Sequence, residues 1–311
     1  MTEKQSVQES LSFKYIVGLA APHTWVASIL PILLAISISG TKQPDLIIYW
    51  VLMLLGCVAL QSAVNIFNDY TDFLKGTDTM GDGVEESDSI LVYHNLPVEQ
   101  VKKLGFIFLG VSLILGALPV VRGGIPVLII GLIGVLAVLL YSAGPLPICS
   151  LPMGELVSGG IMGGLIPLAC LTVIFQEIHF SFLIHTIPTV LGIALIMMTN
   201  NTCDIERDTN VKRYTMSGRL GRKRALVIYR LLLLLWFLSI NLIVLVYFLP
   251  GNLLLILFAI TDLFMLHFFI KQANTTATQS VRPQAMKGIV LLNWVSGLIY
   301  CLWIFLSVYM Y

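Results

Sequence analysis

Two segments of the sequence place carboxylates and amides at the ends of long apolar runs. The first reads NIFNDYTDFLKGTD from Asn65 to Asp78, and the second reads NNTCDIERD from Asn200 to Asp208. Residues three, four and seven positions apart share one face of a helix. Two polar stripes result, one of Asn65, Asn68, Asp69 and Asp72 and the other of Asn200, Asp204 and Asp208. If the stripes meet, at least four carboxylates share a small volume.

Such a concentration of carboxylates needs positive charge nearby. Unpaired carboxylates repel one another, and the negative end of a helix dipole adds to the cost. Mg²⁺ prefers the hard oxygen ligands that carboxylates and amides supply. The two segments together therefore predict a Mg²⁺ site, although each Asp taken singly could also be a solvent-facing helix cap.

Mg²⁺ held by few carboxylates is usually bound jointly with substrate phosphates. Four carboxylates with two Mg²⁺ ions are near neutral, so a diphosphate of charge about −3 needs further cations. Lys75 follows the first motif, and Lys212, Arg213 and Arg219 follow the second. We therefore expect two Mg²⁺ ions that bridge a diphosphate, although the basic run VKRYTMSGRLGRKR can also be a topology signal.

The elements that position these residues are membrane helices. The 311 residues are 57% hydrophobic and 11% charged, with a mean hydropathy of +0.91. Windows of about 20 apolar residues predict spans. They lie near 15–39, 46–67, 103–121, 124–141, 155–175, 180–201, 225–249, 252–270 and 288–309. The expected fold is all-α: a single domain, 1–311, with about nine transmembrane helices around a central cavity in the lipid bilayer.

The charge distribution predicts the orientation in the membrane. With nine spans, Lys42 and Arg122 are the only Lys and Arg residues on the side opposite the N-terminus. The positive-inside rule then makes the N-terminus and both motif loops cytoplasmic, in a multi-pass protein of the plasma membrane. The net charge of +1 gives no reason to expect a nucleic-acid partner, and the five Cys residues lack metal-ligand spacing.

A diphosphate bound inside a membrane indicates a polyprenyl diphosphate, whose tail belongs in lipid. The expected chemistry is ionisation, in which Mg²⁺ and cationic side chains stabilise the leaving diphosphate. An apolar cavity must then keep water away from the allylic cation until an acceptor attacks.

At these residues the sequence resembles the UbiA superfamily of intramembrane aromatic prenyltransferases, in particular its 1,4-dihydroxy-2-naphthoate branch. The first segment is similar to the motif N-x-x-N-D-Y-x-D-x-x-x-G-x-D, and the second to N-N-x-R-D-x-x-x-D. A third patch resembles the family's loop between spans four and five through Tyr141, Gly144, Pro145, Gly154 and Glu155. The resemblance covers nearly the whole chain.

The resemblance implies that Asn68, Asp72, Asp78, Asp204 and Asp208 bind the Mg²⁺–diphosphate. With the stripes, the expected metal ligands are Asn68, Asp69, Asp72, Asp78, Asn201, Asp204 and Asp208, of which Asp72, Asp78, Asp204 and Asp208 are the expected catalytic carboxylates. The expected diphosphate ligands are Asn65, Lys75, Lys212, Arg213 and Arg219. The implied reaction prenylates 1,4-dihydroxy-2-naphthoate with loss of its carboxylate, giving demethylmenaquinone in menaquinone biosynthesis.

The sequence departs from the family pattern where the acceptor is concerned. Cys203 replaces the Arg of the second motif, Arg213 replaces a Lys, and Ala21 replaces the Arg that usually precedes the first-span Pro. The loop after the first motif, TMGDGVEESDSILVYHNLP, is acidic where a basic run is common. The sequence therefore leaves the identity of the aromatic acceptor open. The candidate residues for contact with the acceptor are His23, Tyr70, Tyr141 and Ser142.

Other interpretations stay open at this point. His23 could be a satisfied helix residue, and Tyr141 could be an interfacial anchor. The acceptor could be a homogentisate, a porphyrin-type molecule or an unusual naphthoate. Paired carboxylates also occur in ion-coupled secondary transporters, although transporter sites lie near the midplane rather than at helix ends.

Overall fold

The computed structural model describes residues 8–40, 43–79, 85–144, 147–248 and 252–310, and no strand occurs in these ranges. The helices are α1 (Phe13–Ala20), α2 (Val26–Ser39), α3 (Ile47–Lys75), α4 (Ile90–Tyr93), α5 (Val98–Ser142), α6 (Gly154–Ser158), α7 (Ile166–Phe175), α8 (Leu183–Cys203), α9 (Ile205–Asn210), α10 (Met216–Leu220), α11 (Arg222–Ile243), α12 (Asn252–Ala273) and α13 (Arg282–Met310). A π-helical stretch, Gly159–Leu165, joins α6 to α7.

The long helices have the length and composition of membrane spans. Seven described helical segments qualify singly, and α1 with α2 qualifies as an eighth, bent by 57°. The bend falls at Ala21, which has a left-handed φ of 48°, and at the short 3₁₀ turn Pro22–Thr24 that follows it. The expected all-helical, multi-pass membrane fold is confirmed.

Helix α5 accounts for the difference between eight spans and the nine predicted. Its 45 residues are too long for one straight crossing. Gly124 interrupts it with φ 69° and ψ −157°, a conformation open to glycine alone. Near its start Val101 packs in one buried cluster with Ile66 of α3, and at its end Ser142 Oγ donates to Asn68 Oδ1 of α3 at 2.7 Å. Both limbs therefore run beside α3, and α5 supplies two passes of the approximate nine.

Glycines allow the α6–α7 segment to lie directly against α8. A Cβ atom on Gly163 would lie 2.5 Å from the Val190 Cα, and one on Gly159 would lie 2.6 Å from the Val190 carbonyl oxygen. Thr189 Oγ1 donates to the Gly163 carbonyl oxygen at 2.8 Å across this contact. The glycine-rich sequence SGGIMGGLIP thus serves close helix packing, as expected for membrane helices.

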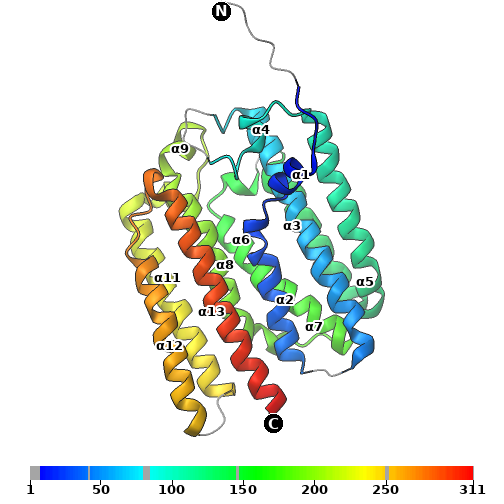
Figure 1. The fold of residues 1–311 in the computed structure, drawn as a ribbon, viewed down its shortest axis with the longest axis vertical. Helices are drawn as coiled ribbons and strands as arrows, with labels where there is room; N and C mark the ends of the chain where they lie inside the picture. The colour runs from blue at the N-terminus through cyan, green and yellow to red at the C-terminus, as the bar shows by residue number, and fades with distance from the viewer. Residues whose placement is uncertain (1–7, 41–42, 80–84, 145–146, 249–251, 311) are drawn as a thin grey trace, which may run out of the picture.

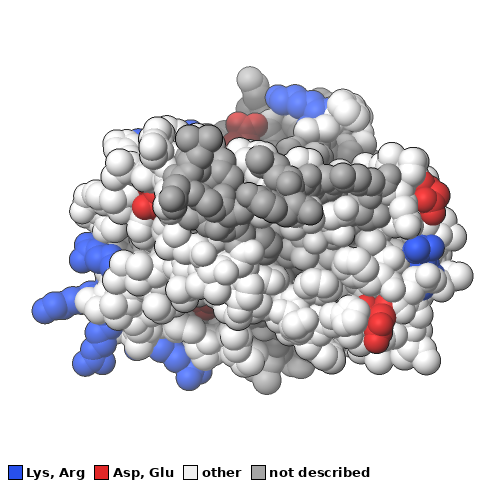
Figure 2. All heavy atoms as spheres, turned by 90° about the horizontal axis from the view of Figure 1, so that it is seen from below, with Lys and Arg blue, Asp and Glu red and all other residues white. Residues whose placement is uncertain are grey.

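Both motifs lie at one end of the bundle, which we call the motif end: α3 and α8 finish there, and α4 and α9 lie beside them (Figure 1). Helix α1 is at this end, whereas α13 finishes at the other, as an odd number of passes requires. Seen from that opposite end, the visible described surface is mostly uncharged, with Lys, Arg, Asp and Glu toward its edges (Figure 2).

Candidate active site

The first motif occupies the last turns of α3 and the chain that leaves it. Asp69 and Asp72 are buried on the helix. Gly76 ends α3 with a left-handed φ of 61°, a role for which glycine is suited. The chain then turns so that Asp78 is buried as well, where its Oδ2 accepts a hydrogen bond from Ser89 Oγ at 2.5 Å. The motif therefore spans a helix end and the return from it.

Asp69 has a structural task in this arrangement. Its Oδ2 accepts the backbone N–H of Ile90 at 2.9 Å, and its Oδ1 accepts that of Leu91 at 3.4 Å. Asp69 thus holds the start of α4 against α3. Both of its oxygens are engaged in the empty protein, and its expected role as a metal ligand stays a prediction.

The second motif occupies the junction of α8 and α9. Asp204 follows the last residue of α8, Asp208 lies on α9, and both are buried. Burial raises the pKa of Asp204 even though Arg282 and Arg207 oppose it. Burial, and next the charge of Asp204, raises the pKa of Asp208 to about 7. Asp208 therefore titrates near neutral pH in the metal-free protein.

An amide of the same motif is oriented by a buried carboxylate. The Nδ2 of Asn201 donates to Glu155 Oε1 at 2.9 Å, and Asn201 lines the cavity described below. This hydrogen bond fixes the amide nitrogen toward Glu155 and leaves the Asn201 carbonyl oxygen available as a ligand.

Arginine side chains bring the two motifs together. Arg207 lies between them, with Nη2 2.6 Å from Asp204 Oδ2 and Nη1 3.4 Å from Asp78 Oδ1. Arg213 forms an ion pair with Asp72, 141 residues away in sequence. The two polar stripes therefore meet, with guanidinium groups between the carboxylates.

A third arginine reaches the site from α13. Arg282 Nε donates to Asp204 Oδ2 at 3.2 Å, and its Nη2 donates to Asn200 Oδ1 at 2.7 Å. Its Nη1 lies 2.6 Å from Asp88 Oδ2. Burial alone would raise the pKa of Asp88, but the hydrogen bond from His23 and the charge of Arg282 outweigh it and lower that pKa to about 2. Asp88 is therefore ionised at neutral pH.

The sequence interpretation missed Arg207 and Arg282. Arg207 stands inside the second motif, three residues after Asp204, so helical spacing could have identified it. Arg282 is 78 residues from Asp204 and opens a hydrophobic helix, so no local pattern marks it. Cys203, the departure from the family motif, is buried beside Ala277 and Ala285.

The remaining predicted residues divide into two groups. Asn65 lines the cavity, and its Nδ2 donates to the Ala20 carbonyl oxygen at 3.0 Å and to Thr24 Oγ1 at 2.8 Å. Lys75 Nζ donates to the Ser142 carbonyl oxygen at 3.1 Å. Outside the cavity lining, Lys212 and Arg219 are exposed and Tyr70 packs against the apolar cluster of Leu19 and Ile66. Contact of these last three with a substrate stays a prediction, and Pro145 lies outside the described residues.

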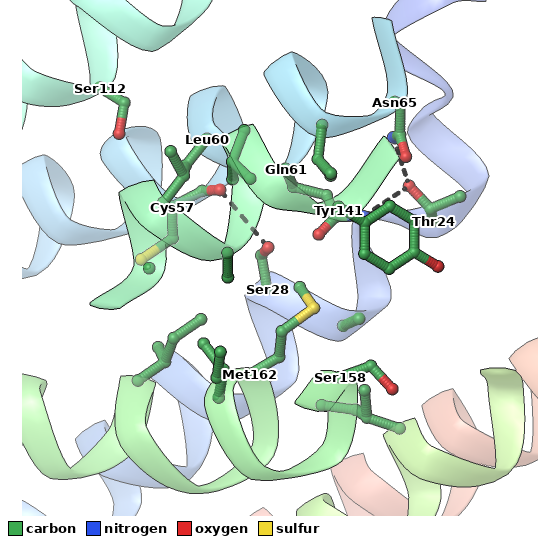
Figure 3. A pocket seen from close by; sticks show the side chains of 18 of the residues that line it. Thr24, Ser28, Cys57, Leu60, Gln61, Asn65, Ser112, Tyr141, Ser158 and Met162 are labelled. Atoms are coloured by element: carbon green, nitrogen blue, oxygen red, sulfur yellow. Dashed lines mark hydrogen bonds between the residues drawn. The ribbon is translucent and has the colours of Figure 1, made fainter. Parts of the chain in front are cut away.

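A cavity of about 620 Å³ runs inward from the two motifs, within the usual range for ligand pockets. At the motif end it is lined by Asp72, Asp78, Asp208, Arg207, Arg213 and Arg282. The rest is largely apolar, lined by α3, both limbs of α5 and α7, as far as Val127 and Val173. Figure 3 shows Gln61 and Asn65 of α3 directed toward Thr24, and Tyr141 lines the same cavity.

The donor set fits Mg²⁺ bound together with a substrate. Asp78 Oδ1 and Asp204 Oδ1 are buried and accept no hydrogen bond, although Asp78 Oδ1 lies 3.4 Å from Arg207 Nη1. Both oxygens can therefore serve as ligands of a cation. Among the described residues no three His, Cys, Asp or Glu side chains are grouped closely enough to hold an ion alone. Mg²⁺ commonly takes one or two carboxylates and completes its shell with phosphate oxygens and water, which is what this site can offer.

Comparison with known proteins agrees with the fold and the motifs. The UbiA prenyltransferase family matches residues 28–293. The 1,4-dihydroxy-2-naphthoate octaprenyltransferase of Bacillus subtilis (strain 168) is 32% identical over 213 residues, 68% of this chain and 67% of that protein. UbiA prenyltransferase domain-containing protein 1 of Xenopus tropicalis is 24% identical over 247 residues, 76% of this chain and 70% of that protein.

A solved structure shares the fold. The UbiA homologue of Archaeoglobus fulgidus bound to GPP and Mg²⁺ superposes with a TM-score of 0.66, covering 95% of this chain and 99% of that chain. Its sequence identity of 16% limits this likeness to the fold.

Proposed function

The chain belongs to the UbiA prenyltransferase family and is a membrane prenyltransferase, and we propose that it carries out Mg²⁺-dependent transfer of a polyprenyl group to 1,4-dihydroxy-2-naphthoate. In this proposal the acceptor loses its carboxylate and becomes demethylmenaquinone. The observation that carries the proposal is the meeting of carboxylates and arginines from two distant motifs at one end of a largely apolar cavity.

The polar end of the cavity would bind the diphosphate of the donor. Asp72, Asp78, Asp204 and Asp208, with the amides of Asn68 and Asn201, would hold two Mg²⁺ ions that neutralise the leaving diphosphate. In the structure Arg213 pairs with Asp72, and Arg207 pairs with Asp204 and Asp78. When cations occupy the carboxylates, these guanidinium groups are free to donate to diphosphate oxygens.

The apolar part of the cavity would bind the prenyl tail and exclude water. Its walls come from transmembrane helices and include Leu52, Met53, Leu60 and Val120. An allylic cation formed at the polar end would therefore meet few water molecules before the aromatic acceptor attacks it. A carrier function, the other interpretation of paired carboxylates, has no support from the family.

The acceptor would lie at the side of the cavity formed by α3 and the turn Pro22–Thr24. Gln61 and Asn65 donate to Thr24 Oγ1 there, and His23 and Tyr141 line the same cavity. These polar groups suit an aromatic ring that carries hydroxyls and a carboxylate. The choice of 1,4-dihydroxy-2-naphthoate rests on the first motif and on the similarity to the Bacillus subtilis enzyme.

Substitution of one carboxylate from each motif tests the proposal. In Asp72→Ala and Asp204→Ala proteins we expect turnover of a polyprenyl diphosphate with 1,4-dihydroxy-2-naphthoate to fall by roughly 10²-fold or more. Asp45→Ala, an exposed acidic residue before α3, is the control and should keep wild-type turnover. Wild-type turnover in either motif variant would remove the proposed metal site.

A further inference from the structure

The proposed reaction leaves the acidic segment after the first motif unexplained. Within it, Asp88 Oδ2 lies 2.6 Å from Arg282 Nη1, and Asp88 Oδ1 lies 3.3 Å from His23 Nε2. A second carboxylate of the segment, Glu85, lies 3.6 Å from the same Arg282 nitrogen. Asp88, His23 and Arg282 all line the cavity. A carboxylate is therefore held at the cavity wall between a cation of α13 and the ring of His23.

Two of the three side-chain nitrogens of Arg282 are hydrogen-bonded to the second motif. Its side chain is 8% exposed, and its Nε and Nη2 donate to Asp204 and Asn200 of the second motif. Its Nη1 lies 2.6 Å from Asp88 Oδ2, in an ion pair, and 3.6 Å from Glu85 Oε2. The contact with the acidic segment is thus an ion pair, in which another anion can take the place of the Asp88 carboxylate.

The position of this contact separates it from the other arginine pairs. Arg213 and Arg207 serve Asp72 and Asp78 of the first motif, where the diphosphate is expected. Arg282 contacts neither of them. It shares Asp204 with Arg207, and in addition it pairs with Asp88, which His23 also contacts. His23 belongs to the turn Pro22–Thr24, whose Thr24 accepts from Gln61 and Asn65.

We propose that His23 and Arg282 form a subsite for an anionic substrate group, and that Asp88, which contacts both residues in the structure, competes with that group for the subsite. Guanidinium and imidazole groups bind a carboxylate of the substrate as they bind the carboxylate of Asp88. The anion can come from the aromatic acid or from the diphosphate, and the location beside Thr24 favours the aromatic acid. This subsite rests on the proposed prenyl transfer, and it would determine which acceptor the protein selects.

The consequence is that loss of the internal carboxylate strengthens binding of the external one. We compare Asp88→Asn with Glu86→Gln. The second substitution removes the same charge at a position two residues away, where the Glu86 side chain is exposed and pairs with His94. Asp88→Asn should lower the KM for 1,4-dihydroxy-2-naphthoate about five- to tenfold, the size expected for one hydrogen bond of ordinary net strength. Glu86→Gln should change it less than twofold.

Choice of ligand identifies the anion. Binding of naphthalene-1,4-diol, which lacks the carboxylate, should be the same in Asp88→Asn and in the unsubstituted protein. Arg282→Gln should weaken binding of the naphthoate and leave that of the diol unchanged. If Asp88→Asn instead strengthens binding of Mg²⁺–pyrophosphate but not of the naphthoate, the subsite exists and binds the diphosphate. Equal behaviour of Asp88→Asn and Glu86→Gln toward both anions overturns the proposal.

Hydrogen exchange on the unsubstituted protein gives a second test that needs no variant. The amides of Asp88 and Ser89 donate within a turn, to Glu85 and Glu86 at 3.0 and 3.4 Å. Displacement of Asp88 should speed exchange at these amides when 1,4-dihydroxy-2-naphthoate is added and not when the diol is added. Unchanged exchange overturns the displacement. Turnover by the unsubstituted protein tests the prenyl transfer itself, so failure of one claim is distinguishable from failure of the other.

Discussion

At the scale of residues, arginines determine the charge of the empty site. Asp72 pairs with Arg213, and Asp204 pairs with both Arg207 and Arg282. Each of these carboxylates is almost fully buried, and a buried charge without a partner is costly by several kcal/mol, on the order of 3–5. The guanidinium groups thus offset part of the cost of burying these carboxylates, and they lie beside the place where a diphosphate would bind.

Arg213 is the residue whose loss we expect to affect the donor most directly. Arg213→Gln leaves Asp72 buried without its cation and removes a donor to the diphosphate, so turnover should fall by roughly 10²-fold with a raised KM for the prenyl diphosphate. Arg219→Gln is the matched control, because Arg219 is exposed and outside the cavity lining. Steady-state kinetics of both variants decide the matter, and equal losses would contradict the assignment of Arg213.

The raised pKa of Asp208 makes metal binding depend on pH. Burial and the charge of Asp204 raise that pKa to about 7, so in the metal-free protein Asp208 is mostly protonated at pH 6 and mostly ionised at pH 8. Mg²⁺ requires the ionised form. The Mg²⁺ concentration at half-maximal activity should therefore rise about tenfold from pH 8 to pH 6. In Asp208→Asn this pH dependence should become weaker, and a flat profile in the unsubstituted protein would count against a role for Asp208.

Helical spacing predicted which residues of each motif share a helix face, but not which residues they pair with. Asp72 and Asp208 could be placed on polar stripes because the three- and four-residue periodicity acts locally. The ion pair of Arg213 with Asp72 is long-range, and Arg282 reaches Asp204 only because α13 packs beside α8. Such contacts depend on tertiary packing, which a single sequence does not encode in any local pattern.

At the scale of elements, the break in α5 allows both limbs to line the cavity. Gly124 has a φ of 69° and a ψ of −157°, which strain any residue with a side chain. Gly124→Ala should therefore lower stability by about 1–3 kcal/mol. Gly110→Ala is the control, since this glycine of the same helix has open space around it. Thermal unfolding in detergent should show a lower Tm for Gly124→Ala alone, and equal Tm values would contradict the role given to this break.

Hydropathy predicted the spans better than their connections. The windows 103–121 and 124–141 were separated correctly, yet they gave no sign that both limbs would run beside α3. Hydrophobic length reports that a segment crosses the bilayer, whereas neighbours are set by side-chain contacts such as that of Ser142 with Asn68. The small-residue pattern around Gly163 indicated close packing but not which helix it would meet.

At the scale of the whole molecule, we propose that the motif end faces the cytoplasm. The distribution of Lys and Arg in the sequence favours this orientation, which would present the site to aromatic acids and to the diphosphate groups of membrane-bound prenyl donors. A protease-sensitive tag on the N-terminus should then be protected in intact cells, while the same tag on the C-terminus should be cleaved. Cleavage of the N-terminal tag with protection of the C-terminal one would reverse the orientation.

All the roles proposed for these residues depend on Mg²⁺-dependent transfer of a prenyl group to an aromatic acid by this protein. Mass spectrometry of products from the purified protein in lipid, supplied with a polyprenyl diphosphate and 1,4-dihydroxy-2-naphthoate, tests it most directly. We predict a product with the mass of the acceptor plus the prenyl group minus carbon dioxide, formed with Mg²⁺ and lost when EDTA is added. Formation of the same product at an undiminished rate in EDTA, or no prenylated product from this acceptor with Mg²⁺ present, would contradict the account.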